Sequence, residues 1–112
     1  MGNVLILARD EVVAALLGLL VELQGFTPKF PEGSQSPEEA IASGRFSVAV
    51  LDCDHPQWSE HLVPSIKAAD VRLILFSPFR TSSEMAQLAS RYAASTFTLP
   101  TDPDTFSRIL RS

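Results

Sequence analysis

The stretch VAVLDCDHP, residues 48–56, runs from four apolar residues directly into the carboxylate of Asp52. Continuous apolar runs are typical of strands that are covered on both faces of a parallel sheet. VLIL at 4–7 is a run of the same kind, and VRLILF at 71–76 is apolar except for Arg72. A buried strand that ends on a carboxylate at a loop is typical of a functional site. The residues that gather around Asp52 therefore decide what the chain does.

Amphipathic stretches alternate with these runs. Asp10 is placed to cap a helix, in which apolar residues recur at helical spacing: Val12, Val13, Leu16, Leu17, Leu20 and Leu23. The predicted strands are 4–7, 27–30, 46–51, 71–76 and 96–99. The predicted helices lie between Asp10 and Gly25, at 36–43, 58–69 and 82–91, and after Asp102. Five strands alternating with five helices indicate one α/β domain over residues 1–112, built on an open parallel sheet.

The composition is that of a globular domain. The chain has 112 residues, of which 46% are hydrophobic and 20% charged. The net charge of −4 and the lack of a Lys/Arg cluster argue against nucleic acid as the main partner. The apolar run 12–21 is too short to span a bilayer, and no signal-peptide pattern is present. A single cysteine, Cys53, suits a reducing compartment, so we expect a cytoplasmic protein without a membrane partner.

Functional groups in open parallel sheets gather at the carboxyl ends of the strands. These ends are predicted at 8–11, 52–55, 77–80 and 99–101. A structural metal at DCDH, residues 52–55, is disfavoured, because neighbouring strand residues point in alternating directions and no second Cys/His cluster completes a shell.

The strand ends resemble those of the response-regulator receiver family over essentially the whole chain. VAVLDCDHP is similar to the family's phosphoacceptor strand, which places the phosphorylated aspartate at Asp52. LILFS is similar to the fourth strand, whose final serine or threonine contacts the phosphoryl group, at Ser77. FTLP is similar to the fifth strand, which ends in Lys-Pro in the family, at Leu99 and Pro100.

The resemblance implies a three-layer α/β/α, flavodoxin-like (βα)5 fold with strand order 2-1-3-4-5. It also implies a non-enzymatic receiver domain of bacterial two-component signalling, which binds a signalling protein around the last helices and the fifth strand. Homodimerisation through that surface is a further expectation. No cofactor is expected, except Mg²⁺ if Asp52 is phosphorylated.

Three of the family's five site positions carry other residues. The acidic pair that binds a divalent cation falls on Ala8 and Arg9, and the lysine falls on Leu99. Phosphoryl transfer to a carboxylate needs a hard cation on oxygen ligands and a nearby ammonium to offset the negative charge. Because these groups are missing, we expect a pseudo-receiver that acts by protein binding, in which the Arg9 guanidinium can pair with Asp52.

In two alternative interpretations, the site holds a negatively charged group, either a phosphoryl group on Asp52 or a bound small anion. In the first, Asp52 still accepts a phosphoryl group, with Asp10, Glu11 or Asp54 supplying the metal ligands. Sliding the alignment by one residue would put Arg9 and Asp10 in the paired positions, although Asp10 is explained as a helix cap.

In the second alternative, the domain binds a small anion through Arg9, Ser77 and Arg80. The family's switch aromatic on the fifth strand falls on Thr96, so that switch is expected to be absent. The neighbouring Phe97 is expected to be a core residue.

Overall fold

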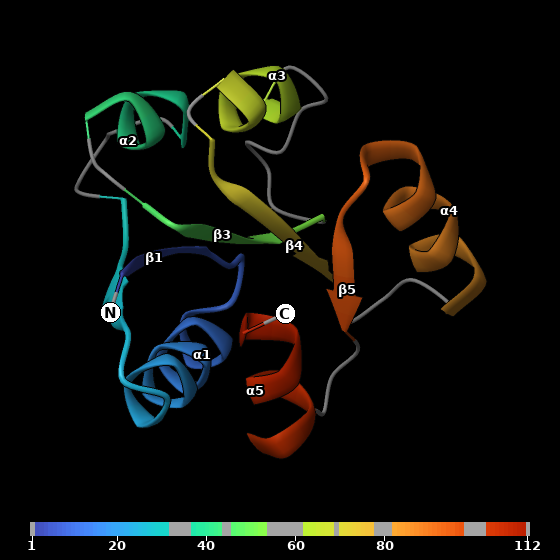
Figure 1. Cartoon of the computed structure of the whole chain (residues 1–112). Helices are drawn as coiled ribbons and strands as arrows, with labels where there is room; N and C mark the ends of the chain where they lie inside the picture. The colour runs from blue at the N-terminus through green and yellow to red at the C-terminus, as the bar shows by residue number, and fades with distance from the viewer. Residues whose placement is uncertain are drawn as a thin grey trace.

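A computed structural model describes residues 2–31, 37–43, 46–53, 62–68, 70–77, 82–97 and 103–111. Strands and helices alternate along the chain (Figure 1): β1 Asn3–Leu7, α1 Glu11–Leu23, β2 Thr27–Lys29, α2 Pro37–Ser43, β3 Val48–Asp52, α3 Leu62–Ala68, β4 Arg72–Phe76, α4 Ser82–Tyr92, β5 Ser95–Phe97 and α5 Pro103–Arg111. Within these ranges, none of the helices has the length and apolar content needed to cross a membrane.

The strands form one parallel sheet in the order β2-β1-β3-β4-β5. This confirms the predicted fold class and strand order. The register places Leu7 of β1 beside Leu51 of β3, and Asp52 beside Phe76 of β4. Phe76 in turn lies beside Phe97 of β5. The carboxyl ends of the four strands therefore meet along one edge of the sheet.

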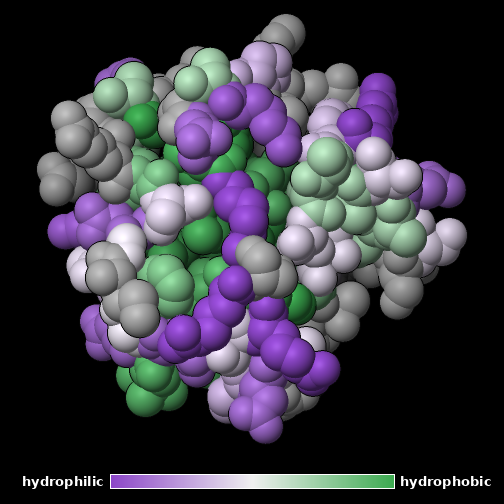
Figure 2. All heavy atoms as spheres, in the orientation of Figure 1, coloured by the Kyte–Doolittle hydropathy of each residue, from purple (hydrophilic) through white to green (hydrophobic). Residues whose placement is uncertain are grey.

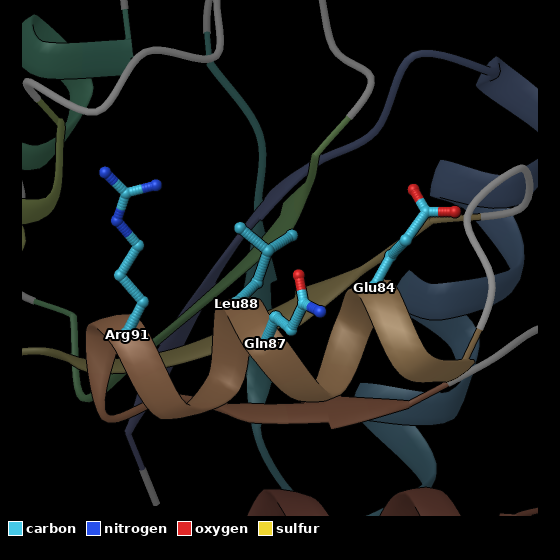
Figure 3. Close-up of a pocket in the computed structure, with 4 residues that line it drawn as sticks. All are labelled: Glu84, Gln87, Leu88 and Arg91. Atoms are coloured by element: carbon cyan, nitrogen blue, oxygen red, sulfur yellow. The ribbon is translucent and has the colours of Figure 1, made fainter.

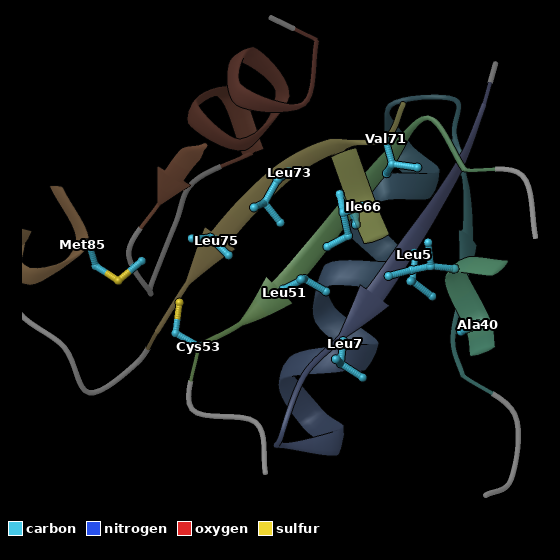
Figure 4. Packing of buried hydrophobic residues seen from close by; sticks show 12 residues of the cluster. Leu5, Leu7, Ala40, Leu51, Cys53, Ile66, Val71, Leu73, Leu75 and Met85 are labelled. Carbon is cyan, nitrogen blue, oxygen red and sulfur yellow. The ribbon is translucent and has the colours of Figure 1, made fainter. Parts of the chain in front are cut away.

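Helices cover both faces of the sheet, so that alternate strand residues enter two separate cores. One core packs against α1 and α5, which lie below the sheet in Figure 1, and includes Leu17, Phe106 and Leu110. The other packs against α2, α3 and α4, and Figure 4 shows Ile66 and Met85 among its members. Each large apolar side chain that is fully buried contributes roughly 1.5–3 kcal/mol to folding, which explains why the strands need continuous apolar runs.

Helix α1 begins where the sequence predicts. Asp10 caps it, since its Oδ1 accepts from the main-chain N–H groups of Val12 at 2.7 Å and Val13 at 3.3 Å. After the helix, Gly25 adopts a φ of 85°, a left-handed conformation that glycine takes without steric cost.

The structure divides the apolar residues of α1 between two sides of the helix. Leu17, Leu20 and Val21 are buried against the sheet. Four further apolar residues lie at the surface and form the exposed α1 stripe, with exposed fractions of 77% for Val12, 48% for Leu16, 54% for Leu19 and 65% for Leu23. Because nearly every position of this helix is apolar, periodicity alone does not show which side meets the sheet.

Arg72, the first residue of β4, forms a hydrogen bond with the end of α5. Its Nη2 donates to the main-chain carbonyl of Ile109, within the last turn of the helix. Carbonyls in the last turn have no partner within the helix, so a fixed guanidinium satisfies one of them. Burial lowers the pKa of Arg72 below its ordinary value. Sequence reasoning assigned no role to this residue.

We expect Arg72→Met to destabilise the domain by about 1–3 kcal/mol, because the substitution keeps most of the aliphatic stem but leaves the Ile109 carbonyl without this donor. Chemical denaturation measures the loss, and amide hydrogen exchange should accelerate first in α5. Lys67→Met, at an exposed position of α3, is the matched control. Equal stability of the two variants would contradict this role for Arg72.

Candidate functional site

The candidate site lies where β3 and β4 end. Asp52 is the last residue of β3 and is 3% exposed, and Ser77 directly follows β4 and is 2% exposed. Within the described part of the chain, these two are the only buried polar or charged side chains. The main-chain N–H of Cys53 donates to the carbonyl of Phe76 at 2.9 Å, so the ladder between the strands continues past Asp52. The two residues that the sequence singled out thus lie at the same edge of the sheet, at the ends of neighbouring strands.

Asp52 is held by the loop that follows β1. Its Oδ2 accepts a hydrogen bond of 3.0 Å from the main-chain N–H of Arg9. Hydrogen bonds to an ionised acceptor are stronger than neutral ones. The contact joins residues 43 positions apart in sequence and fixes the β1–α1 loop against the central strand. The sequence predicted an ion pair between the Arg9 guanidinium and Asp52, but the hydrogen bond shown comes from the main-chain N–H of Arg9. Arg9 as a whole residue is exposed.

The residues beside Arg9 have structural roles. Ala8 is half-buried and packs with the core that faces α1 and α5, so it presents a methyl group and no ligand atom. The carboxylate of Asp10 is engaged as the α1 cap. Glu11 is exposed in the first turn of α1. Across the described segments, no group of three Asp, Glu, His or Cys residues is placed to hold a metal ion.

Four residues of the predicted site fall outside the described ranges: Asp54, Arg80, Leu99 and Pro100. Their roles stay predictions: Asp54 as a metal ligand, Arg80 as an anion ligand, and Leu99 with Pro100 at the family's Lys-Pro position.

Comparison with known proteins identifies the architecture. No model of a known family and no curated protein matches the sequence. Among solved structures, the chain is similar to a response regulator receiver protein from Burkholderia phymatum, with a TM-score of 0.83 and 15% identity over 98% of this chain and 92% of the other. It is also similar to the chemotaxis protein CheY4 of Vibrio cholerae, with a TM-score of 0.80 and 16% identity over 99% and 97% of the two chains. For the signal receiver domain of a modulated diguanylate cyclase from Desulfovibrio desulfuricans, the TM-score is 0.76 with 22% identity over 99% and 91%.

This chain has the receiver fold. Asp52 stands at the end of β3 and Ser77 directly follows β4. Their roles as phosphoacceptor and phosphoryl-contacting hydroxyl stay predictions of the sequence resemblance. The structure adds that the main-chain N–H of Arg9 donates to one oxygen of the Asp52 carboxylate.

Three aromatic rings form a column beneath the site of this receiver fold. Phe76 and Phe97 stack with ring centres 5.2 Å apart and 19° between their planes. Phe106 of α5 meets Phe97 edge-on, at 5.4 Å and 87°. Phe97 is 5% exposed, which confirms that it is a core residue. The column itself was missed from sequence, although aromatic residues at the carboxyl ends of neighbouring parallel strands are a usable signal for it.

A cavity of about 230 Å³ lies elsewhere, along α4. Its described lining comprises Glu84, Gln87, Leu88 and Arg91, and Figure 3 shows Glu84, Leu88 and Arg91 projecting to the same side of the helix. The sequence did not point to this cavity, since none of its four described lining residues stands at a strand end.

We expect Asp52→Ala to accelerate hydrogen exchange of the Arg9 amide by at least about tenfold, because the substitution removes the acceptor that protects this N–H. Asp52→Asn keeps an oxygen acceptor and should preserve most of the protection. Exchange followed by NMR at Arg9 measures both effects. An Arg9 amide that exchanges at the same rate in the wild type and in Asp52→Ala would show that the hydrogen bond is not formed in solution.

Phe97→Leu should lower the free energy of unfolding by about 1–3 kcal/mol, because it removes both ring contacts and leaves a partly filled space. Thermal unfolding measures the change. Phe30→Leu, at a ring that is 45% exposed, should cost much less. Equal losses in the free energy of unfolding at the two positions would mean that the ring contacts of Phe97 add nothing beyond ordinary apolar contact.

Proposed function

We propose that this chain is a degenerate receiver domain, which acts in two-component signalling by binding a signalling protein and is not phosphorylated by the Mg²⁺-dependent route. The observation that carries the proposal is the environment of Asp52. Ala8 packs its methyl group with the core, and Arg9 meets Asp52 through its main-chain N–H, so neither position to which the resemblance assigns a metal-binding carboxylate provides one.

The charge balance around Asp52 supports this proposal. A phosphoryl group brings several negative oxygens next to a carboxylate, and a divalent cation normally offsets them. Ala8 has no ligand atom, and a cationic side chain at Arg9 repels a metal ion. The nearest acid in sequence, Asp10, already accepts two helix N–H groups. Recruiting its carboxylate to a metal would remove a cap that stabilises α1 by about 1 kcal/mol.

A second candidate function is a working phosphoacceptor. It is favoured by the burial of both Asp52 and Ser77 at the carboxyl ends of neighbouring strands, where the resemblance implies the phosphoacceptor and the phosphoryl-contacting hydroxyl. In this version, Asp10, Glu11 or Asp54 supplies the metal ligand in a shifted geometry.

The partner surface proposed for the degenerate receiver is formed by α4, β5 and α5, as the family resemblance implies. The Phe76–Phe97–Phe106 column supports this choice, because it couples the end of β4 beside Asp52 to β5 and α5 through direct ring contacts. A partner on this surface would therefore contact elements that pack against the site.

Intact mass and amide NMR shifts, recorded with acetyl phosphate and then with beryllofluoride, each with and without Mg²⁺, test the proposal. We expect no phosphoryl mass on the wild type and no Mg²⁺-dependent shifts at Asp52 or Ser77. The double substitution Ala8→Asp with Arg9→Asp restores two carboxylates and should introduce Mg²⁺-dependent shifts at the same residues.

Asp52→Asn is the control for this experiment, because it removes the acceptor carboxylate and keeps the side-chain shape. A phosphoryl mass on the wild type that is absent from Asp52→Asn would overturn the degenerate assignment and establish the working phosphoacceptor.

A further inference from the structure

Four of the five large apolar side chains that are exposed in the described part of the chain lie on one helix. Four form the α1 stripe, Val12, Leu16, Leu19 and Leu23, and the fifth is Phe30, directly after β2. Phe30 adjoins α1, because a Cβ added at Gly18 would approach its ring to 3.1 Å. In Figure 2, a green group of atoms stands out at the lower left, over α1. Contiguous apolar patches of this kind mark contact surfaces.

The spacing of the stripe is that of a helix-pairing seam. Its members follow one another at intervals of four, three and four residues, which is the a/d repeat of a coiled coil. Leu17 and Val21, which are fully buried against the sheet, belong to the opposite side of the helix. The stripe therefore points away from the core of its own domain and is free to meet a second helix.

The two borders of the stripe carry opposite charges. On the helix surface, Glu22 and Gln24 lie on opposite sides of Leu23. The Gln24 side faces α5, because Nη2 of Arg111 donates to the Gln24 carbonyl at 2.8 Å. Arg108, one turn earlier on α5, is exposed as well. The stripe thus has an acidic border at Glu22 and a basic border on α5.

We propose that a second copy of this chain covers the exposed α1 stripe, with the two α1 helices parallel about a two-fold axis that runs along them. This symmetry places each stripe residue near its own counterpart and makes the contact self-complementary. It also sets the acidic border of one copy against the α5 border of the other, so that Glu22 faces Arg111 of the second copy. An antiparallel pair would instead bring the two acidic borders together.

The size of the seam sets the strength of the dimer. Three turns of one helix present an apolar patch of a few hundred Å², which is less than the roughly 800 Å² per partner of a standard interface. The dimer should therefore form at micromolar or higher concentrations. This inference concerns a surface away from Asp52 and does not depend on whether that residue is phosphorylated.

Sedimentation velocity over a range of concentrations tests the proposal on three single variants. Leu19→Glu puts a charge in the centre of the seam and should raise the dimer dissociation constant at least about tenfold. Ala86→Glu adds the same charge at an exposed position of α4 and should change nothing. Because Leu19 is already half exposed, circular dichroism should show an intact fold in its variant.

Glu22→Arg distinguishes the two helix orientations. In the parallel dimer, the new arginine faces Arg111 of the second copy and weakens association. In an antiparallel dimer, the new arginine of each copy would instead lie near the exposed Glu11 at the far end of the other copy's acidic border. Association would then tighten, which would overturn the proposed arrangement. A wild-type chain that stays monomeric at several hundred micromolar would overturn the dimer itself and leave the stripe to a helix of a different protein.

Discussion

The central position of β3 is the constraint on which the rest of this structure depends. All five of its residues are buried, and the strand is paired with β1 on one side and β4 on the other. A strand in that position has to be apolar on both faces, so a carboxylate is tolerated only at its end, where main-chain donors can reach it. The N–H of Arg9 supplies one such donor. The location of the candidate site thus follows from the packing of the sheet.

Much of the fold was predictable because parallel sheets leave a strong trace in sequence. The runs at 4–7, 48–51 and 73–76 are apolar on both faces, and helix caps such as Asp10 separate them. The strand order came from the family resemblance, since periodicity carries no information on which strands are neighbours. The buried side of α1 was not predictable from a helix in which most residues are apolar. The role of Arg72 was also hidden, because a single arginine in an apolar run gives no indication of the distant carbonyl it contacts.

The site shows the same division between what sequence specifies and what packing decides. That Asp52 and Ser77 lie at the same edge of the sheet follows from their positions at the ends of adjacent strands. Sequence also pointed to Arg9 as a partner of Asp52, but the direction of a main-chain N–H depends on the path of a loop. The contact therefore uses a different part of the residue from the one expected. The contact does not depend on the arginine side chain, because any residue except proline can donate the same main-chain hydrogen bond.

The position of Cys53 gives the molecule a built-in reporter. It is the only cysteine of the chain, it directly follows Asp52, and it is 3% exposed within the core that faces α2, α3 and α4. A thiol reagent reaches such a side chain only when the end of β3 separates from its neighbours. The rate of alkylation at this one sulfur atom therefore records how often the edge of the sheet that carries Asp52 and Ser77 opens, without any label being introduced.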